Sequence, residues 1–361
     1  MLFDIPLFSS FGSGGAYRIG VDISSSSVKV VELSGRGGKY VLEGYAVELL
    51  PKDLIQDGNI SNVAQVGEAL RRGLKRVGAH TKNVAIALPS STAITKKITV
   101  SANQKEEDLE LTVEAEANQS IPFPLDEVNL DYWVIGPAPN VPGEIEVLIA
   151  AARREKVEDY AAVAESAGAK PMIIDIESLA IQHAFAAIAP TLAGKGRGKN
   201  IALFDMGVNN TRFYVFHDND ILFSREMSFG GNQLTVDIQR AYNLPSGEAE
   251  TAKKAGGLPE NYRNDVLRPY MDNVAMEIAR ALQFFSTTTT FGPVQQIVLS
   301  GGCSLINGLD RAITQQASVP VVIANPFAAI KASNHVRAQQ LAQDTPLLLT
   351  ATGLALRSFE S

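Results

Sequence analysis

The chain has 361 residues, of which 45% are hydrophobic and 20% charged. It is therefore long and apolar enough to form two lobes, each with a buried core, and its composition is not that of a disordered chain. Its formal net charge of −7, without a long run of Lys or Arg, argues against nucleic acid as the main partner. Cys303 is the only cysteine, which excludes an intramolecular disulfide and indicates a reducing compartment, the cytoplasm.

No segment of the sequence predicts a membrane passage. Residues 1–15 have no basic start and are interrupted by Pro6, so they do not resemble a signal peptide, and we expect a flexible tail at residues 1–16. The apolar stretch 178–194 contains His183 and Pro190, which suits a buried helix better than a membrane span. The histidines are too scattered for a zinc site, and the sequence contains no P-loop.

The first part of the chain has the pattern of a sheet covered by helices. Apolar alternation predicts a hairpin and a third strand, and helical spacing after the N-cap Asn62 predicts a helix. These elements are expected at residues 18–21, 27–33, 39–49 and 62–77. An α+β insert follows, with elements expected at residues 84–88, 93–100, 104–120, 128–135, 145–152 and 156–168. A strand at 171–175 and a helix at 177–189, ended by Pro190, close the first lobe.

A second, similar half begins at Asn200, after a flexible basic linker. A hairpin and a strand at 221–225 lead to a glycine turn that opens a helix, and helical spacing continues to about residue 285. A short strand at 297–299 runs into Ser300-Gly301-Gly302, and a helix is expected from about residue 306. The apolar C-terminal stretch 345–356 predicts a helix docked on the body of the protein.

One turn occurs in both halves: an apolar strand ending near an Asp, a loop of small residues and a second apolar strand. Small residues allow backbone N–H groups to approach phosphate, and an Asp at the strand end can hold a divalent cation through water. We therefore predict a polyphosphate clamp with Mg²⁺ held through water by Asp22 and Asp205, and with Lys29, seven residues after Asp22, neutralising a phosphate. The loop residues expected to bind phosphate are Ser24, Ser25, Ser26, Ser27, Gly207, Asn209, Asn210 and Thr211.

Two glycine turns complete the predicted nucleotide site. Gly230 and Gly231 precede a helix, while Gly301, Gly302 and Ser304 follow a strand and suit the close approach of a base or ribose. Taken alone, each piece is more typical of an ordinary turn, and Lys29 of a solvated strand residue. A nucleotide site is favoured by the order in which these turns occur along a chain whose two halves are similar.

That order and spacing resemble the actin superfamily, which contains sugar kinases, chaperone ATPase domains and the division protein FtsA. Residues 19–29 are similar to its first phosphate loop, 203–213 to its second and 297–308 to its adenosine motif. Residues 174–180 resemble its first connecting helix, which implies that Glu177 lies near an attacking water. The segment 249–253 resembles the AExxK run of FtsA-like members, which implies that Glu250 and Lys253 flank adenosine.

The resemblance implies a two-lobed, actin-like α/β fold, in which a ribonuclease H-like unit is duplicated and the first lobe carries the insert. Its subdomains are expected at 17–82, 171–197 and about 335–361 (1A), 83–170 (1C), 198–232 and 286–334 (2A), and 233–285 (2B). The second loop departs from the glycine-rich form of the superfamily at Val208, Asn209 and Asn210. Binding of ATP or ADP is therefore expected, with weak or absent hydrolysis.

The insert, together with residues 19–29, resembles the PilM family of type IV pilus assembly proteins. The similar residues are 114–132, where Pro122 and Pro124 end an acidic helix and hold Phe123 and Leu125 in an extended segment. The segment equally suits a purely structural role, in which the prolines end the helix and the apolar side chains fill the core. The resemblance implies a cytoplasmic scaffold peripheral to the inner membrane, needed for pilus biogenesis and twitching motility. It also implies that the N-terminal cytoplasmic peptide of PilN binds in a groove between subdomains 1A and 1C.

Two alternatives come from the same superfamily. A small-molecule kinase would need a carboxylate base aimed at a substrate hydroxyl in the interlobe cleft, and the sequence offers no clear candidate. An FtsA-like filament former would need an amphipathic membrane anchor, yet residues 351–361 contain only Arg357 as a basic side chain. Recruitment to the membrane by a partner is the favoured interpretation.

Overall fold

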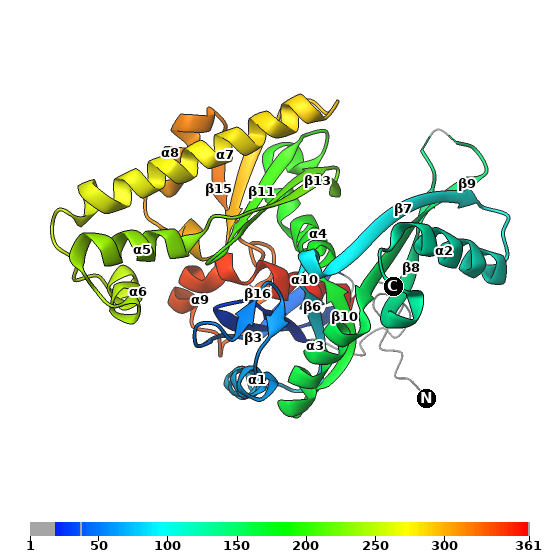
Figure 1. Cartoon of the computed structure of the whole chain (residues 1–361), viewed down its shortest axis with the longest axis horizontal. Coiled ribbons are helices and arrows are strands. Elements are labelled where there is room, and N and C mark those ends of the chain that lie inside the picture. The colour runs from blue at the N-terminus through cyan, green and yellow to red at the C-terminus, as the bar shows by residue number, and fades with distance from the viewer. Residues whose placement is uncertain (1–18, 37, 140, 360–361) are drawn as a thin grey trace. The chain divides into compact units, whose positions relative to one another are not determined.

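The computed structural model describes residues 19–36, 38–139 and 141–359; the tail expected at residues 1–16 lies outside the described residues. The chain divides into two compact units (Figure 1). Unit 1 comprises Met1–Ala184, Lys331–Val336 and Thr350–Ser361, and unit 2 comprises Phe185–Ile330 and Arg337–Leu349. No helix in the described part of the chain is both long and apolar enough to cross a membrane.

Unit 1 is built on a six-stranded mixed sheet. Its strands, in spatial order, are β10 (Lys170–Ile176), β6 (Asn83–Leu88), β1 (Ile19–Ile23), β2 (Ser27–Arg36), β3 (Lys39–Leu49) and β16 (Lys331–Ala332). The β1–β2–β3 meander is antiparallel, whereas β1, β6 and β10 run parallel. A small hairpin of β4 (Ile55–Gln56) and β5 (Asn59–Ile60) precedes the first helix.

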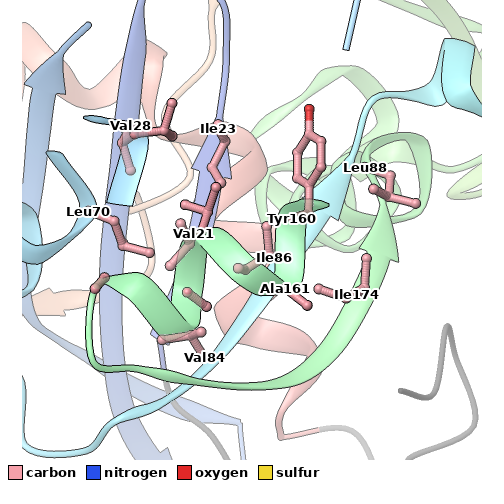
Figure 2. Close-up of a cluster of buried hydrophobic side chains, with 14 of the residues drawn as sticks. Val21, Ile23, Val28, Leu70, Val84, Ile86, Leu88, Tyr160, Ala161 and Ile174 are labelled. Atoms are coloured by element: carbon pink, nitrogen blue, oxygen red, sulfur yellow. The ribbon is translucent and has the colours of Figure 1, made fainter. Parts of the chain in front are cut away.

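Helices cover both faces of this sheet. On one face, α1 (Val63–Val77) and α3 (Arg154–Ser166) pack against the strands and bury the apolar cluster of Figure 2, which includes Val21, Leu70 and Tyr160. The expected N-cap is confirmed: the Asn62 side chain accepts the N–H of Gln65 at 3.0 Å. On the other face, α4 (Glu177–Ile188) and α10 (Leu349–Arg357) share a core with β6 and β10.

Glycines allow α10 to approach its neighbours closely. A Cβ atom on Gly20 of β1 would lie 2.0 Å from the carbonyl oxygen of Ala351, and one on Gly353 would lie 1.7 Å from that of Ala180. The C-terminal helix is therefore docked on unit 1, as the sequence predicts, and it is held by backbone contact that tolerates no side chain at these two positions.

The insert is a three-stranded antiparallel sheet with one covering helix. Its strands β7 (Ala93–Ser101), β9 (Glu144–Arg153) and β8 (Val128–Pro137) lie in that order, so β9 is central. The acidic helix α2 (Glu106–Ser120) packs on one face through Leu109, Val113 and Ala117. Because strand residues alternate between faces, this leaves the opposite face to be covered elsewhere.

Unit 2 repeats the strand arrangement of unit 1. Its sheet has the order β13 (Asp220–Met227), β12 (Thr211–His217), β11 (Ile201–Met206), β14 (Gln296–Ser300) and β15 (Val321–Ile323). The first three strands again form an antiparallel meander, and β11, β14 and β15 again run parallel. The duplication inferred from the repeated turn is thus present in the sheet topology itself.

The helices of unit 2 are α5 (Gly231–Tyr242), α6 (Ser246–Ala255), α7 (Arg268–Thr288), α8 (Leu309–Ala317) and α9 (Ala338–Asp344). A single π-helical turn, Arg263–Leu267, leads into α7, the long yellow helix of Figure 1. The core joins α5, α7 and α8 to the sheet around Phe204, Phe213 and Phe285. The rings of Phe204 and Phe213 stack with centroids 4.5 Å apart.

Candidate functional site

The first repeated turn places an acid and a base opposite each other. Asp22 on β1 and Lys29 on β2 are cross-strand partners, and the Lys29 ammonium donates to Asp22 Oδ2 at 2.7 Å and to Ser24 Oγ at 3.1 Å. Both charged side chains are about nine-tenths buried. An ammonium has three N–H donors, so these contacts leave one direction for an anionic oxygen.

The serine loop between these strands is closed by its own hydrogen bonds. The N–H of Ser24 donates to the carbonyl oxygen of Ser27 at 3.0 Å, and its hydroxyl donates to the same oxygen at 3.1 Å. Ser25 and Ser26 lie at the tip and are half-buried. The loop is therefore preorganised with small side chains at its tip, as close approach to phosphate requires.

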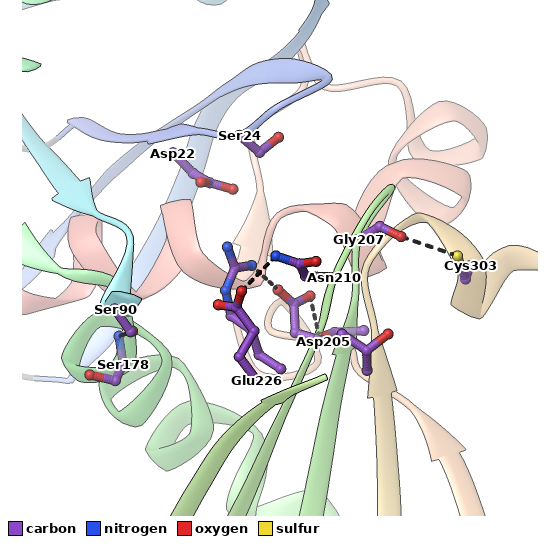
Figure 3. Close-up of polar contacts among 12 residues, drawn as sticks. Asp22, Ser24, Ser90, Ser178, Asp205, Gly207, Asn210, Glu226 and Cys303 are labelled. Carbon is purple, nitrogen blue, oxygen red and sulfur yellow. Dashed lines mark hydrogen bonds and ion pairs between the residues drawn. The ribbon is translucent and has the colours of Figure 1, made fainter. Parts of the chain in front are cut away.

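The second turn has the same cross-strand pair, with arginine in place of lysine. Arg212 on β12 faces Asp205 on β11, and its Nη1 donates to Asp205 Oδ2 at 3.3 Å. Asp205 Oδ1 accepts the Ser300 hydroxyl at 2.8 Å, which joins β11 to the end of β14 (Figure 3). The sequence predicts no role for Arg212, and it includes Ser300 only as part of a glycine turn. The signal for Arg212 was present, because it follows Asp205 by the seven positions that separate Asp22 from Lys29.

The rest of the second loop is bonded within unit 2. The N–H of Gly207 donates to the carbonyl oxygen of Asn210 at 3.0 Å, and the Asn210 amide donates to Glu226 at 2.5 Å (Figure 3). Thr211 is fully buried and its hydroxyl donates to the carbonyl oxygen of Phe229 at 2.8 Å. Asn209 is exposed. The polar side chains at 210 and 211 thus contribute to holding the loop in shape.

Two glycine turns lie against this loop. A Cβ atom on Gly230 would lie 2.5 Å from the carbonyl oxygen of Val208, and one on Gly301, whose φ is +80°, would lie 2.4 Å from that of Met206. Next to them, the Ser304 hydroxyl donates to the carbonyl oxygen of Gly301 at 2.6 Å. The predicted elements around Gly207, Gly230 and Gly301 are therefore brought together in one place in unit 2, with their backbones in contact.

The predicted pair on α6 belongs to a polar network that reaches the same place. Lys253 Nζ lies 2.6 Å from Glu250 Oε2 and donates to Thr235 Oγ1 at 2.7 Å and to the carbonyl oxygen of Gly231 at 3.1 Å. Partial burial raises the pKa of Glu250, but the hydrogen bonds from Lys253 and Thr235 outweigh it and lower that pKa to about 2. Glu250 is therefore a carboxylate at neutral pH.

The predicted connecting helix begins in unit 1. Glu177 is the first residue of α4 and is buried, and the N–H of Ser178 donates to Ser90 Oγ at 3.1 Å (Figure 3). Just before it, Asp175 is fully buried and forms an ion pair with Arg357 on α10. The N-terminus of α4 is thus fixed by contacts from two other parts of unit 1.

The two aspartates suit a cation held through water rather than a preformed metal cage. Asp22 and Asp205 each have one oxygen engaged by a basic side chain, and no cluster of three or more His, Cys, Asp or Glu residues occurs in the described ranges. An Mg²⁺ ion commonly keeps several waters and takes further ligands from substrate phosphates. Within its own unit, each aspartate is therefore chemically compatible with an Mg²⁺ ion held through water.

The duplicated sheets and their paired hairpins define the class: an actin-like ATPase fold. Residues 20–359 match the family model described as type IV pilus assembly protein PilM, and the chain belongs to this family. Among solved structures, it is 26% identical to a chain of a "PilM-PilN type IV pilus biogenesis complex", with a TM-score of 0.79. The match covers 96% of this chain and 100% of that one.

More distant structures share the fold alone. Ethanolamine utilization protein EutJ from Carboxydothermus hydrogenoformans is 16% identical with a TM-score of 0.55, over 94% of this chain and 89% of that one. A diol dehydratase-reactivating factor in nucleotide-free form is 11% identical, also with a TM-score of 0.55, over 95% and 99% of the two chains.

Proposed function

We propose that this protein is an ATP-binding scaffold of type IV pilus assembly, held at the cytoplasmic side of the inner membrane by the N-terminal peptide of PilN. The observation that carries the proposal is the match to a chain of a PilM–PilN complex, at 26% identity over 96% of this chain. Pilus biogenesis and twitching motility then depend on this scaffold. Its task is to bind a partner, and this requires no catalytic chemistry of its own.

The paired hairpins support nucleotide binding. In each unit a basic side chain is fixed by a cross-strand aspartate beside a loop of small residues, at 2.7 Å in unit 1 and 3.3 Å in unit 2. Fixed cations and loop N–H groups are the usual binding partners of phosphate oxygens. We propose that Lys29 and the Ser24–Ser27 loop bind phosphates of ATP or ADP, and that Glu250 and Lys253 lie beside the adenosine.

Weak turnover is part of the proposal. Hydrolysis requires a water held in a fixed place, and Glu177 is the side chain that we assign to orient it. The second loop has Asn209 and Asn210 in place of the glycines or threonine of the superfamily form that the sequence resembles, and Asn210 already donates to Glu226 at 2.5 Å. We therefore expect nucleotide binding to greatly exceed hydrolysis.

We place the PilN peptide between subdomain 1A (residues 17–82, 171–197 and about 335–361) and subdomain 1C (residues 83–170). On the sheet face opposite α2, Ala150 and Ala152 of β9 pack into the unit 1 core with Tyr160 of α3. Leu148 is the next residue of β9 on that face, and its cross-strand partner on β8 is Trp133. The apolar face therefore continues beyond α3 into a partly exposed strip.

Trp133 is the feature of this strip that suits peptide binding. It is 40% exposed, and β8 is an edge strand of its sheet. Large exposed aromatic residues are frequent anchors of protein interfaces, and a strand edge offers main-chain hydrogen bonds to an extended peptide. We propose that the peptide packs against Trp133 and Leu148 of subdomain 1C, beside α3, the helix that packs on the sheet of subdomain 1A.

Fluorescence anisotropy of a labelled PilN N-terminal peptide tests the location. Trp133→Ala is expected to weaken binding by about 2 kcal/mol, roughly 30-fold in Kd. Leu111→Ala is the matched control, because Leu111 is 65% exposed on α2, on the covered side of the same sheet. Equal affinities for the two variants would place the peptide elsewhere.

Isothermal titration with ATP and ADP in the presence of Mg²⁺ tests the nucleotide half of the proposal. We expect saturable binding of both nucleotides, with slow release of phosphate from ATP. Absence of heat in both titrations would refute nucleotide binding without affecting the peptide result. Release of ADP that depends on an added sugar would instead identify a kinase.

A further inference from the structure

Three glycine-containing segments of unit 2 meet at one buried thiol. The Cys303 S–H donates to the carbonyl oxygen of Gly207 at 3.4 Å (Figure 3), and this oxygen also accepts the N–H of Gly231 at 3.0 Å. Gly207 begins the second hairpin loop, Gly231 begins α5, and Cys303 follows the turn after β14. One carbonyl oxygen therefore joins all three segments.

A tyrosine from α7 completes this arrangement. The Tyr270 hydroxyl donates to the carbonyl oxygen of Gly230 at 3.3 Å and lies 3.8 Å from Cys303 Sγ. Tyr270 is 3% exposed and Cys303 is 5% exposed. Burial raises the pKa of both side chains, so each keeps its proton and remains a donor at neutral pH.

The backbone is closely packed around the thiol. A Cβ atom on Gly230 would lie 2.6 Å from the carbonyl oxygen of Gly207, and one on Gly231 would lie 3.0 Å from Cys303 Sγ. Hydrogen bonds between segments in backbone contact fix their spacing, because neither segment can shift toward the other.

We propose that Tyr270 and Cys303 form a brace that holds the second hairpin loop and the Gly230–Gly231 turn at the spacing required for nucleotide phosphates. Both act as positioning residues: they set the loop and do not touch the ligand. This inference rests on the proposed nucleotide binding. It predicts that loss of the brace loosens the loop in the free protein and weakens phosphate binding selectively.

The first test needs no nucleotide. Because Cys303 is the only cysteine, its alkylation rate in the native protein reports local opening at this one position. Tyr270→Phe keeps the ring and removes the hydroxyl, and we expect alkylation and amide exchange at residues 207–211 to rise about tenfold. Tyr242→Phe is the matched control, because Tyr242 donates to Asn261 at 3.3 Å on the exposed surface of the same unit. Equal rates in both variants would overturn the brace.

The second test compares ligands with and without phosphates. We expect Tyr270→Phe and Cys303→Ala to weaken ADP about fivefold or more and adenosine by a clearly smaller factor, since ADP has phosphates that contact the loop and adenosine has none. Cys303→Ser retains a donor toward Gly207 and is expected to restore ADP affinity. Equal loss for ADP and adenosine would indicate a merely structural role and would overturn the proposal. If the wild-type protein binds neither ligand, the proposed nucleotide site fails, while the alkylation result still decides whether the brace exists.

Discussion

Replacement of Lys29 separates the stability of the first hairpin from its binding of phosphate. Lys29→Met removes an ammonium that lies 2.7 Å from Asp22 Oδ2, where both side chains are only 10% exposed. The Asp22 carboxylate then remains in the fold without its cation. Asp22→Asn combined with Lys29→Met removes both charges and leaves the shape of the pair almost unchanged.

The burial of the pair sets the expected magnitude. Removing one partner of a buried ion pair costs about 3–5 kcal/mol, whereas replacing both partners is often close to neutral. This pair is not completely buried, so we expect the single variant to lose about 3 kcal/mol of unfolding free energy. The double variant should lie within about 1 kcal/mol of the wild type.

Urea unfolding and titration with Mg²⁺–ADP measure the two effects on the same proteins. The double variant should be stable yet bind ADP at least tenfold more weakly, because the cation that contacts phosphate is absent. A double variant as unstable as the single one would refute the role of the pair in the fold. A stable double variant with wild-type ADP affinity would refute the role of Lys29 in binding.

Three further predictions concern stability. Folding depresses the pKa of Glu250 from 4.5 to about 2, so the ionised carboxylate stabilises the fold fully above pH 4.5 and this stability is lost as the pH falls through about 2. Glu250→Gln should therefore flatten the pH dependence of the unfolding free energy between these two values. Acid titration followed by circular dichroism measures this. Gly353→Ala should destabilise the protein by at least about 3 kcal/mol, because the new Cβ atom would lie 1.7 Å from a backbone oxygen of α4. Gly247→Ala should instead stabilise it by roughly 0.5–1 kcal/mol, because the space around this position in α6 is open. Arg357→Met leaves the fully buried Asp175 without its ion-pair partner and should cost about 3–5 kcal/mol in urea unfolding, and no loss would contradict the importance of this contact for docking α10.

Local patterns made the hairpins and helices predictable. The turn at Asp22 and the capped helix after Asn62 are specified by neighbouring residues, so the sequence alone sufficed. The strands β15 and β16 and the helix α9 were not predicted. Two- and three-residue strands show no period, and α9 buries no residue that would mark an apolar face.

The contacts within the candidate site were only partly predictable. The sequence singled out the segments around Gly207, Gly230 and Gly301, which lie together in unit 2, because small residues at strand ends are visible in the sequence. The contacts through Cys303 and Tyr270 were not predicted. The Cys303 thiol is 96 positions from its acceptor Gly207, and the Tyr270 hydroxyl is 40 positions from its acceptor Gly230. Only the folded chain brings such partners together.

The most direct test of the central claim is the emission of Trp133 during titration of the intact protein with a synthetic PilN N-terminal peptide. Trp133 is the only tryptophan and is 40% exposed in the proposed peptide path, so its emission reports directly on this surface. We predict a saturable change with one peptide bound per chain and no change with a scrambled peptide. A flat signal, or an equal response to the scrambled peptide, would contradict the account.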